Sequence, residues 1–293
     1  MRKESFDYDA LCSSVEALSR QEALRVTRLG KSILGRDLPM LMLGEGKRSV
    51  LYVGGVRGTE GECAFLLMRF VEDYLEQLSR NSTVFEYAMQ YLFREYRIYI
   101  LPMLNPDGVS YVTRGVEAKN PLRERLLSMN GSSDFSAWEA NARGVDLGRN
   151  FDVDFRKRKQ GETADSIING ATHVYSGEYP ESEPETAALC AFLRTVAPQM
   201  DGVLSFEMGD GDIYCDCKDN MTAKTVSVGR VLSRFTGFQL ARPETLCSVG
   251  SLSDWCIRTL HLPAFTLKCN KTVSSSVLYE RLRRVLFSFP CIV

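Results

Sequence analysis

Histidine is scarce in this sequence, and its scarcity limits the metal chemistry that the chain can support. Only His173 and His261 occur among the 293 residues. A metal site built on two imidazoles would need both of them, and neither stands beside another plausible ligand. The composition therefore argues against a histidine-rich metal centre.

An excess of charge of either sign is also missing. Lys and Arg number 36 and Asp and Glu number 37, a formal net charge of −1. This balance gives no global field that would attract nucleic acid or an anionic membrane. No apolar run approaches the roughly 20 residues of a membrane-spanning helix, and residues 1–7 lack the apolar stretch of a secretory signal. We expect a cytoplasmic protein that binds neither nucleic acid nor membrane.

Regular cysteine spacing is absent as well. The nine cysteines are scattered, and the single close pair, Cys215 and Cys217, has no second pair to complete four metal ligands. We interpret the cysteines as reduced thiols that pack as small apolar residues.

Segments typical of buried strands alternate with segments of helical periodicity, which predicts an α/β fold. No linker or repeat divides the chain, so we expect one domain over residues 1–293. A turn is predicted at residues 105–108. The polar stretch 109–179 is expected to carry the site, and a helix capped by Ser182 is predicted after it. The predicted strands are residues 49–54, 97–102, 202–206 and 264–267, and helices are predicted at residues 64–78 and 277–286.

Six motifs occur in a fixed order along the chain. Residues 30–38 read GKSILGRDL, residues 53–60 VGGVRGTE and residues 101–108 LPMLNPDG; residues 144–151 read GVDLGRNF, residues 182–186 SEPET after a YSG at 175–177, and an Asp-Trp pair ends at Trp255. Together they resemble the zinc metallocarboxypeptidases of the carboxypeptidase A type. The stretch from Asn120 to Asn141 is similar to the bacterial branch that cleaves γ-D-glutamyl bonds in cell-wall peptides. The resemblance implies a single α/β/α domain with a twisted, mixed eight-stranded sheet.

The resemblance also identifies the positions that hold zinc in the family, and here they are substituted. The three ligand positions carry Arg57, Glu60 and Glu207, where the family has histidine, glutamate and histidine. The position of the family's catalytic glutamate, the general base, is occupied by Lys268, thirteen residues after Trp255. Asp146 keeps the aspartate that orients the first histidine in the family.

The substrate-binding positions are partly retained. Arg149 matches the family's carboxylate-binding arginine, and Asn150 beside it is included in the predicted substrate site. Gly148 replaces the asparagine that grips the carboxylate together with this arginine. The family's other polarising arginine has two candidates here, Arg123 and Arg125.

The substituted residues are unsuited to zinc catalysis. A guanidinium stays protonated and offers only donors, so Arg57 cannot be a ligand and places a positive charge where a dication would sit. Two carboxylates are fewer than the three protein ligands of a catalytic zinc site. We therefore expect no cofactor, although the family uses zinc, and predict that Arg57, Lys268, Glu60 and Glu207 form a salt-bridge quartet with Asp146 bonded to Arg57.

Three functional hypotheses follow. The first is an inactive member of the family that binds a peptide, or a peptide derived from peptidoglycan, through a free carboxylate. The second is a working hydrolase that uses zinc with unusual ligands or uses Lys268 with the acidic pair. The third is a scaffold whose cleft is closed by its own salt bridges.

Overall fold

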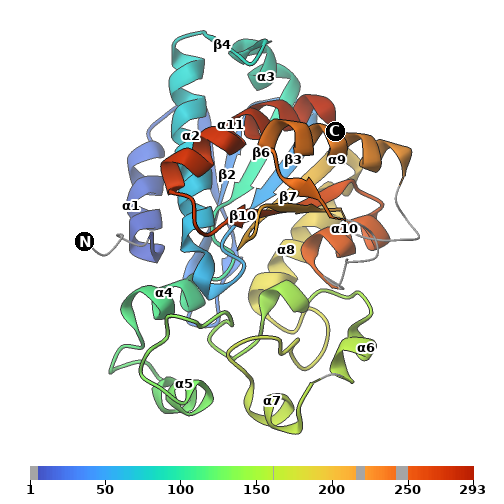
Figure 1. Ribbon diagram of the computed structural model, residues 1–293. Coiled ribbons are helices and arrows are strands. Elements are labelled where there is room, and N and C mark those ends of the chain that lie inside the picture. The colour runs from blue at the N-terminus through green and yellow to red at the C-terminus, as the bar shows by residue number, and fades with distance from the viewer. Residues whose placement is uncertain (1–5, 161, 216–221, 242–249) are drawn as a thin grey trace.

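A mixed sheet of eight strands forms the centre of the computed structural model, in the order β1-β2-β6-β3-β7-β10-β8-β9 (Figure 1). The structure describes residues 6–160, 162–215, 222–241 and 250–293. The strands are β1 Leu24–Lys31, β2 Asp37–Leu43, β3 Arg48–Val53, β6 Tyr96–Leu101, β7 Met200–Gly209, β8 Asp212–Tyr214, β9 Gln239–Leu240 and β10 Ala264–Asn270, with a separate hairpin of β4 Thr83–Val84 and β5 Tyr87–Ala88. The eight-stranded α/β architecture expected from the motifs is confirmed.

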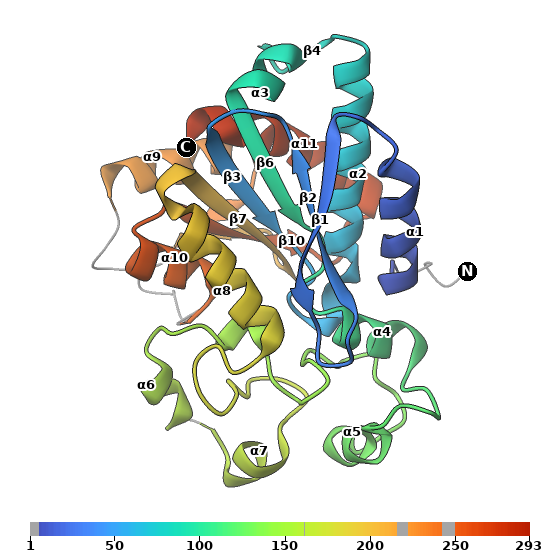
Figure 2. The same ribbon diagram turned by 180° about the vertical axis from the view of Figure 1, so that it is seen from behind.

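Helices cover both faces of this sheet. The α-helices are α1 Tyr8–Leu18, α2 Gly61–Ser79, α3 Met89–Glu95, α4 Pro106–Arg114, α5 Arg123–Asn130, α6 Phe155–Lys159, α7 Ala164–Asn169, α8 Pro184–Val196, α9 Ala223–Thr236, α10 Leu252–Leu260 and α11 Ser275–Ile292; short 3-10 turns are η1 Gly58–Glu60, η2 Leu147–Arg149 and η3 Ala197–Gln199. Figure 2 shows α8 and α10 on one face, and α1, α2, α9 and α11 lie on the other. None of the helices in the described part of the chain has the length and apolar character to cross a bilayer.

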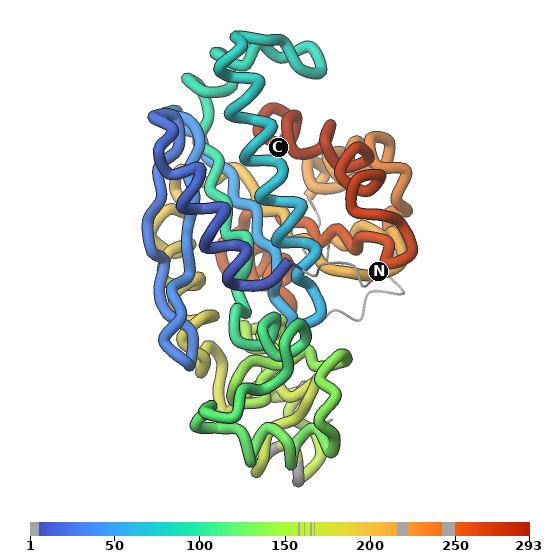
Figure 3. Tube along the Cα trace, turned by 90° about the vertical axis from the view of Figure 1, so that its left-hand side faces the viewer, coloured from blue at the N-terminus to red at the C-terminus, as the bar shows by residue number. Residues whose placement is uncertain are grey.

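Alternation along the strands divides the core into two layers, because successive side chains point to opposite faces. Val50, Tyr52 and Phe206 pack with α2 and α11, whereas Leu51 and Val53 pack with Leu189 of α8 and Trp255 of α10. A third, smaller cluster around Trp138 supports the segment between α4 and η2. Residues 105–160 and 162–183 lie beyond one end of the sheet (Figure 3).

The C-terminal helix is fixed to the centre of the sheet by one buried hydrogen bond. Pro290 lies inside α11 and has no N–H to donate to the carbonyl of Leu286, four residues earlier. The hydroxyl of Tyr52 in β3 donates to that carbonyl instead, at 2.7 Å.

Two local predictions need correction. Residues 105–108 form the start of α4 rather than a turn, because Asn105 accepts a hydrogen bond from the Gly108 N–H and Pro106 occupies the first helical turn. The N-cap of α8 is Glu183 rather than Ser182, whose hydroxyl instead contacts Asn150 at 3.0 Å.

Candidate functional site

Arg57 lies just beyond the carboxyl end of β3 and immediately precedes η1 and α2. Its backbone N–H donates to the Glu60 Oε2 atom at 3.0 Å, which places the Glu60 carboxyl beneath the turn. Glu60 is only 2% exposed. The turn that joins strand to helix therefore brings a guanidinium and a buried carboxyl to the same end of the sheet.

Glu207 and Lys268 are brought together by the sheet itself. They are register partners in the parallel strands β7 and β10, so their side chains leave the same face. The Lys268 Nζ atom lies 3.8 Å from the Glu207 Oε2 atom and 5.0 Å from the centre of the Tyr214 ring. Lys268 keeps 29% of its side chain exposed, whereas the Glu207 side chain is 7% exposed.

The Arg57 guanidinium is the centre of the cluster. Its Nη1 atom lies 2.8 Å from Glu207 Oε2 and 3.6 Å from Glu60 Oε1. Its Nε atom lies 3.2 Å from Asp146 Oδ1 and 3.7 Å from Glu139 Oε2. The four residues of the predicted quartet are therefore in contact: Arg57 pairs with both glutamates, and Lys268 pairs with Glu207. Asp146, which was predicted to bond to Arg57, forms an ion pair with it.

Burial and neighbouring charges shift the pKa values of Glu60 and Glu207 in opposite directions. Desolvation, followed by the negative charge of Glu207, raises the pKa of Glu60 to about 8. Desolvation also acts on Glu207, but Arg57 and Lys268 outweigh it and lower its pKa. Asp146, then Glu207 and Glu60, raise the pKa of Arg57 well above its ordinary value. Near neutral pH the cluster thus contains a charged Arg57, a charged Glu207 and a largely protonated Glu60.

These residues do not fit a zinc ion. The guanidinium occupies the space between Glu60 and Glu207 and bonds directly to the latter, so a dication there would meet a fixed positive charge. Nowhere in the described ranges do three His, Cys, Asp or Glu side chains gather in a way that could hold a metal. The two carboxylates at the family's ligand positions are committed to Arg57 and Lys268.

The predicted carboxylate-binding residues differ in their burial. Arg149 ends η2, directly after Gly148, and is partly exposed. Asn150 is fully buried: its Nδ2 donates to the Ser176 carbonyl at 2.7 Å and its Oδ1 accepts from the Glu183 N–H at 3.2 Å. The amide of Asn150 therefore holds the loop before α8, and the structure does not support its inclusion in a substrate site.

Arg123 and Arg125 do not join the cluster. Both lie exposed on α5, and the Arg125 Nη2 atom donates to the Asn169 carbonyl at 3.1 Å. Within the described part of the chain, neither has a hydrogen bond or ion pair with Arg57, Glu207 or Lys268. The expectation that one of them polarises a substrate beside this site has no support in the geometry.

Glu139 is a member of the cluster that the sequence did not reveal. It lies between Trp138 and Ala140, both fully buried, and its own side chain is 36% exposed beside Arg57. The available signal was the place of Glu139 between two apolar residues, Trp138 and Ala140, both of which are buried in the small core.

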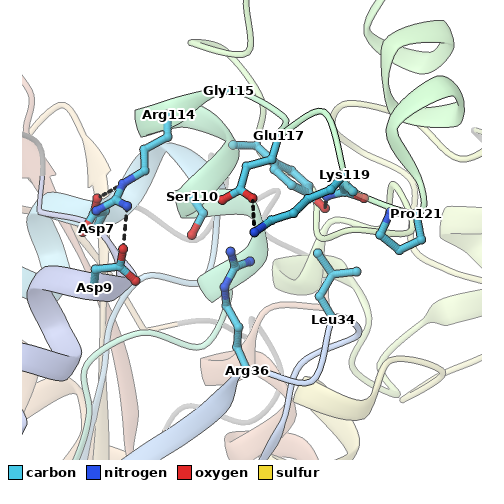
Figure 4. A pocket seen from close by; sticks show the side chains of 12 residues that line it. Asp7, Asp9, Leu34, Arg36, Ser110, Arg114, Gly115, Glu117, Lys119 and Pro121 are labelled. Atoms are coloured by element: carbon cyan, nitrogen blue, oxygen red, sulfur yellow. Dashed lines mark hydrogen bonds and ion pairs between the residues drawn. The ribbon is translucent and has the colours of Figure 1, made fainter.

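A separate polar cavity of about 340 Å³ lies between α1, α4 and the loop before α5 (Figure 4). Its cations are paired with neighbouring carboxylates. Arg114 contacts Asp7 and Asp9, Lys119 contacts Glu117, and Arg36 contacts Asp107 at 2.7 Å. With its cations already neutralised by internal carboxylates, this cavity is a weaker candidate than the cluster around Arg57.

Comparison with known proteins agrees with the motifs and the fold. The model of the family described as zinc carboxypeptidase matches residues 12–225. The chain belongs to the zinc carboxypeptidase family. It is 26% identical over 268 residues to the gamma-D-glutamyl-L-diamino acid endopeptidase 1 of Lysinibacillus sphaericus, covering 91% of this chain and 66% of that relative. The chain thus spans just under two thirds of the relative's length.

Solved structures of the family show the same fold. Bovine thrombin-activatable fibrinolysis inhibitor, in complex with tick carboxypeptidase inhibitor, aligns with a TM-score of 0.70 at 19% identity over 97% of this chain and 93% of that chain. Murein-tripeptide amidase from Escherichia coli O157 aligns with a TM-score of 0.54 at 20% identity over 90% and 91%. The zinc carboxypeptidase fold is therefore retained around a site whose residues do not suit zinc.

Proposed function

We propose that this protein is a catalytically inactive member of the zinc carboxypeptidase family that binds peptides through a free carboxylate. The observation that carries the proposal is the direct pairing of the Arg57 guanidinium with Glu207, two residues at positions that hold the metal in the family. A site occupied by this ion pair has no Lewis acid and no acidified water with which to attack a peptide bond.

The residue at the general-base position supports the same conclusion. Lys268 is an ammonium group paired with Glu207, and an ammonium group has three donors and no acceptor. It can stabilise an anion but cannot remove a proton from water while it is so paired. Loss of the metal position and of the base position together argues against hydrolysis by the family's chemistry.

Arg149 is the proposed anchor for the ligand. Arg149 is a partly exposed residue, and a guanidinium is a planar fork that matches a carboxylate with two parallel hydrogen bonds. The names of two relatives, a gamma-D-glutamyl-L-diamino acid endopeptidase and a murein-tripeptide amidase, favour cell-wall peptides as the ligand class. We propose that it is a bacterial, cytoplasmic protein that binds such peptides.

Metal content tests the loss of the zinc site. Protein purified without chelator and dialysed against micromolar zinc is expected to retain well under one equivalent per chain, measured by elemental analysis. Stoichiometric zinc that is lost in Glu60→Gln or Glu207→Gln would contradict the proposal. Hydrolysis of a peptide that is abolished by Lys268→Met would favour the alternative of an active enzyme.

Ligand capture tests the binding role. We expect γ-D-glutamyl-L-lysine peptides with free carboxyl ends to raise the melting temperature more than their amidated forms, because ligands that bind only the native state stabilise it. Arg149→Ala should remove this difference, and Arg28→Ala, which changes an exposed arginine on β1, is the control. Equal shifts for acid and amide would exclude the carboxylate anchor.

A further inference from the structure

Gly148 occupies a position where the structure leaves no room for a side chain. A Cβ atom there would lie 2.7 Å from the Arg57 Nη2 atom, 3.2 Å from its Cζ atom and 3.1 Å from Asp146 Oδ1. Gly148 is not among the glycines with positive φ, so its backbone would accept other residues. Space, rather than backbone conformation, therefore limits a side chain at position 148, which would have to displace the end of the Arg57 side chain.

The three nitrogens of this guanidinium are used unequally. Nε faces Asp146 and Glu139, and Nη1 faces Glu207 and Glu60. Nη2, the nitrogen that lies over Gly148, makes no hydrogen bond to another described residue, whereas Nη1 donates to Glu207. It is also not one of the buried nitrogens that lack a partner, so this end of the guanidinium reaches solvent. The Arg57 side chain as a whole is 20% exposed.

We propose that Arg57 is a ligand-binding residue, and that its Nη2 atom donates to the ligand's carboxylate across the surface left open by Gly148. The choice of a carboxylate as the ligand rests on the proposed function. Two departures from the family pattern, at positions 57 and 148, then act together. In the family the asparagine at position 148 binds the carboxylate, whereas here Gly148 leaves space for Arg57, which donates from the turn after β3.

The ion pairs of Arg57 fix its guanidinium before a ligand arrives. Its Nη1 atom lies 2.8 Å from Glu207 Oε2, and its Nε atom lies 3.2 Å from Asp146 Oδ1. Because these anchors hold the guanidinium in place, little side-chain entropy is lost on binding. Lys268, whose Nζ atom lies 3.8 Å from Glu207 Oε2, adds a second positive charge to the cluster.

A direct test follows the Arg57 side chain by NMR while acetate is added, with acetamide as the neutral control. We expect a saturable shift of the Arg57 Nε–H and Nη resonances with acetate alone, assigned by their loss in Arg57→Lys. Gly148→Ala should abolish the shift, because the added Cβ covers or displaces Nη2 while Nε and Nη1 remain beside their carboxylates. No acetate-specific shift at Arg57 in the wild-type protein, or an undiminished shift in Gly148→Ala, would overturn the proposal.

A second test uses the free-acid and amidated γ-D-glutamyl-L-lysine peptides in calorimetric titrations. Arg57→Lys and Gly148→Ala should each weaken binding of the free acid about tenfold, about 1.4 kcal/mol, with little change for the amide. Arg36→Lys is the matched control, because Arg36 is also a partly buried arginine paired with a buried carboxylate, at 2.7 Å from Asp107.

The variants separate this inference from the proposed function on which it rests. If Arg149→Ala abolishes binding of the free acid while Arg57→Lys and Gly148→Ala bind normally, the proposed function stands and the role of Arg57 is wrong. If no peptide binds but acetate shifts Arg57 in the wild-type protein and not in Gly148→Ala, the peptide proposal is wrong and Arg57 remains a carboxylate donor. Melting curves establish that each variant is folded, and Gly148→Ala suffices if Arg57→Lys does not fold.

Discussion

A single arginine side chain at the end of β3 holds three buried carboxyl groups together. Glu60 and Asp146 are each 2% exposed and Glu207 is 5% exposed, and all three lie within 4 Å of the Arg57 guanidinium. Buried charges of one sign are costly unless an opposite charge is fixed among them. Arg57 therefore has a structural task in addition to its proposed contact with ligand.

Arg57→Ala is expected to destabilise the protein by about 3–5 kcal/mol, because it removes the cation beside the buried Asp146 and leaves Glu207 paired with the more distant Lys268. Chemical unfolding monitored by circular dichroism measures the change. Arg28→Ala is the control, since the ion pair of Arg28 with Asp37 is half exposed on both sides and should contribute under about 1 kcal/mol. Similar costs for the two variants would show that the Arg57 contacts add no stability.

Glu60 gives the stability a characteristic dependence on pH. Its pKa is about 8 in the native state against an ordinary value of 4.5, so the native state binds more protons than the unfolded chain between these values. Stability from this group is complete below pH 4.5 and is lost as pH rises, with a slope of at most about 1.4 kcal/mol per pH unit. Glu60→Gln should flatten this dependence between pH 5 and 8, measured by denaturant unfolding at each pH.

A second buried carboxyl allows this prediction to be checked for specificity. Burial raises the pKa of Glu185 to about 8 as well, and its Oε1 atom accepts from the Ile33 N–H at 3.2 Å, away from Arg57. Glu185→Gln should remove a separate part of the same slope, and the two variants should add. An unchanged slope in Glu60→Gln would mean that Glu60 is ionised in the native state at neutral pH.

The identities of the residues at the site could be predicted from the sequence, but their contacts could be predicted only in part. Short motifs flank Arg57, Glu207 and Lys268, and strand register then brings Glu207 beside Lys268. The contact of Nη2 with Gly148 depends on the rotamer of a long side chain and on three segments meeting at one point, which no local pattern encodes. Glu139 was missed for the same reason, and the motif around Asn150 does not reveal that its amide is hydrogen-bonded within the protein.

At the scale of elements, helix α4 connects the sheet to the segment that carries Glu139. Asn105 caps this helix through its Oδ1 atom, while its Nδ2 atom donates to the carbonyls of Glu139 at 3.3 Å and Ala140 at 3.1 Å. The Asn-Pro-Asp-Gly sequence suggested a turn because the same residues favour turns and helix starts, and only the partners of the side chain decide between them.

Asn105→Ala should therefore cost more than the loss of an ordinary cap. A helix cap contributes about 0.5–2 kcal/mol, and the two carbonyls would in addition lose a buried donor, which costs about 1–3 kcal/mol. Thr222→Ala at the start of α9 is the matched control, because Thr222 caps its helix by accepting from the Thr225 N–H and is exposed. Thermal unfolding should show the larger loss for Asn105→Ala.

At the scale of the whole molecule, the family's sheet and helices persist although the metal position is filled by a side chain. The expectation of a mixed eight-stranded sheet came from the resemblance to the family, whereas the apolar segments of the sequence predicted four of its strands, β3, β6, β7 and β10. Strands β1 and β2 were not predicted, because β1 is a largely exposed edge strand with charged residues and β2 contains Pro39. Strands β8 and β9, of three and two residues, are too short for a periodic signal.

Because the Arg57 guanidinium occupies the metal position, a chelator should not change the stability of the protein. We expect the melting temperature to be the same with and without EDTA, and unchanged by added zinc at concentrations that stabilise metal-binding relatives, because a ligand that does not bind the native state cannot stabilise it. Differential scanning calorimetry measures both conditions. A chelator-dependent fall in melting temperature would reveal a structural metal.

The hydrogen bond from Tyr52 to the Leu286 carbonyl makes two distant residues thermodynamically interdependent. Tyr52→Phe should cost about 1–3 kcal/mol because the carbonyl is buried and Pro290 has no N–H to replace the hydroxyl. In a Pro290→Ala background the helix regains that N–H, so the same change at Tyr52 should cost less, and a double-mutant cycle measures the difference. Four residues separate Tyr52 from Arg57, so Pro290 and the arginine at the site are both linked to strand β3.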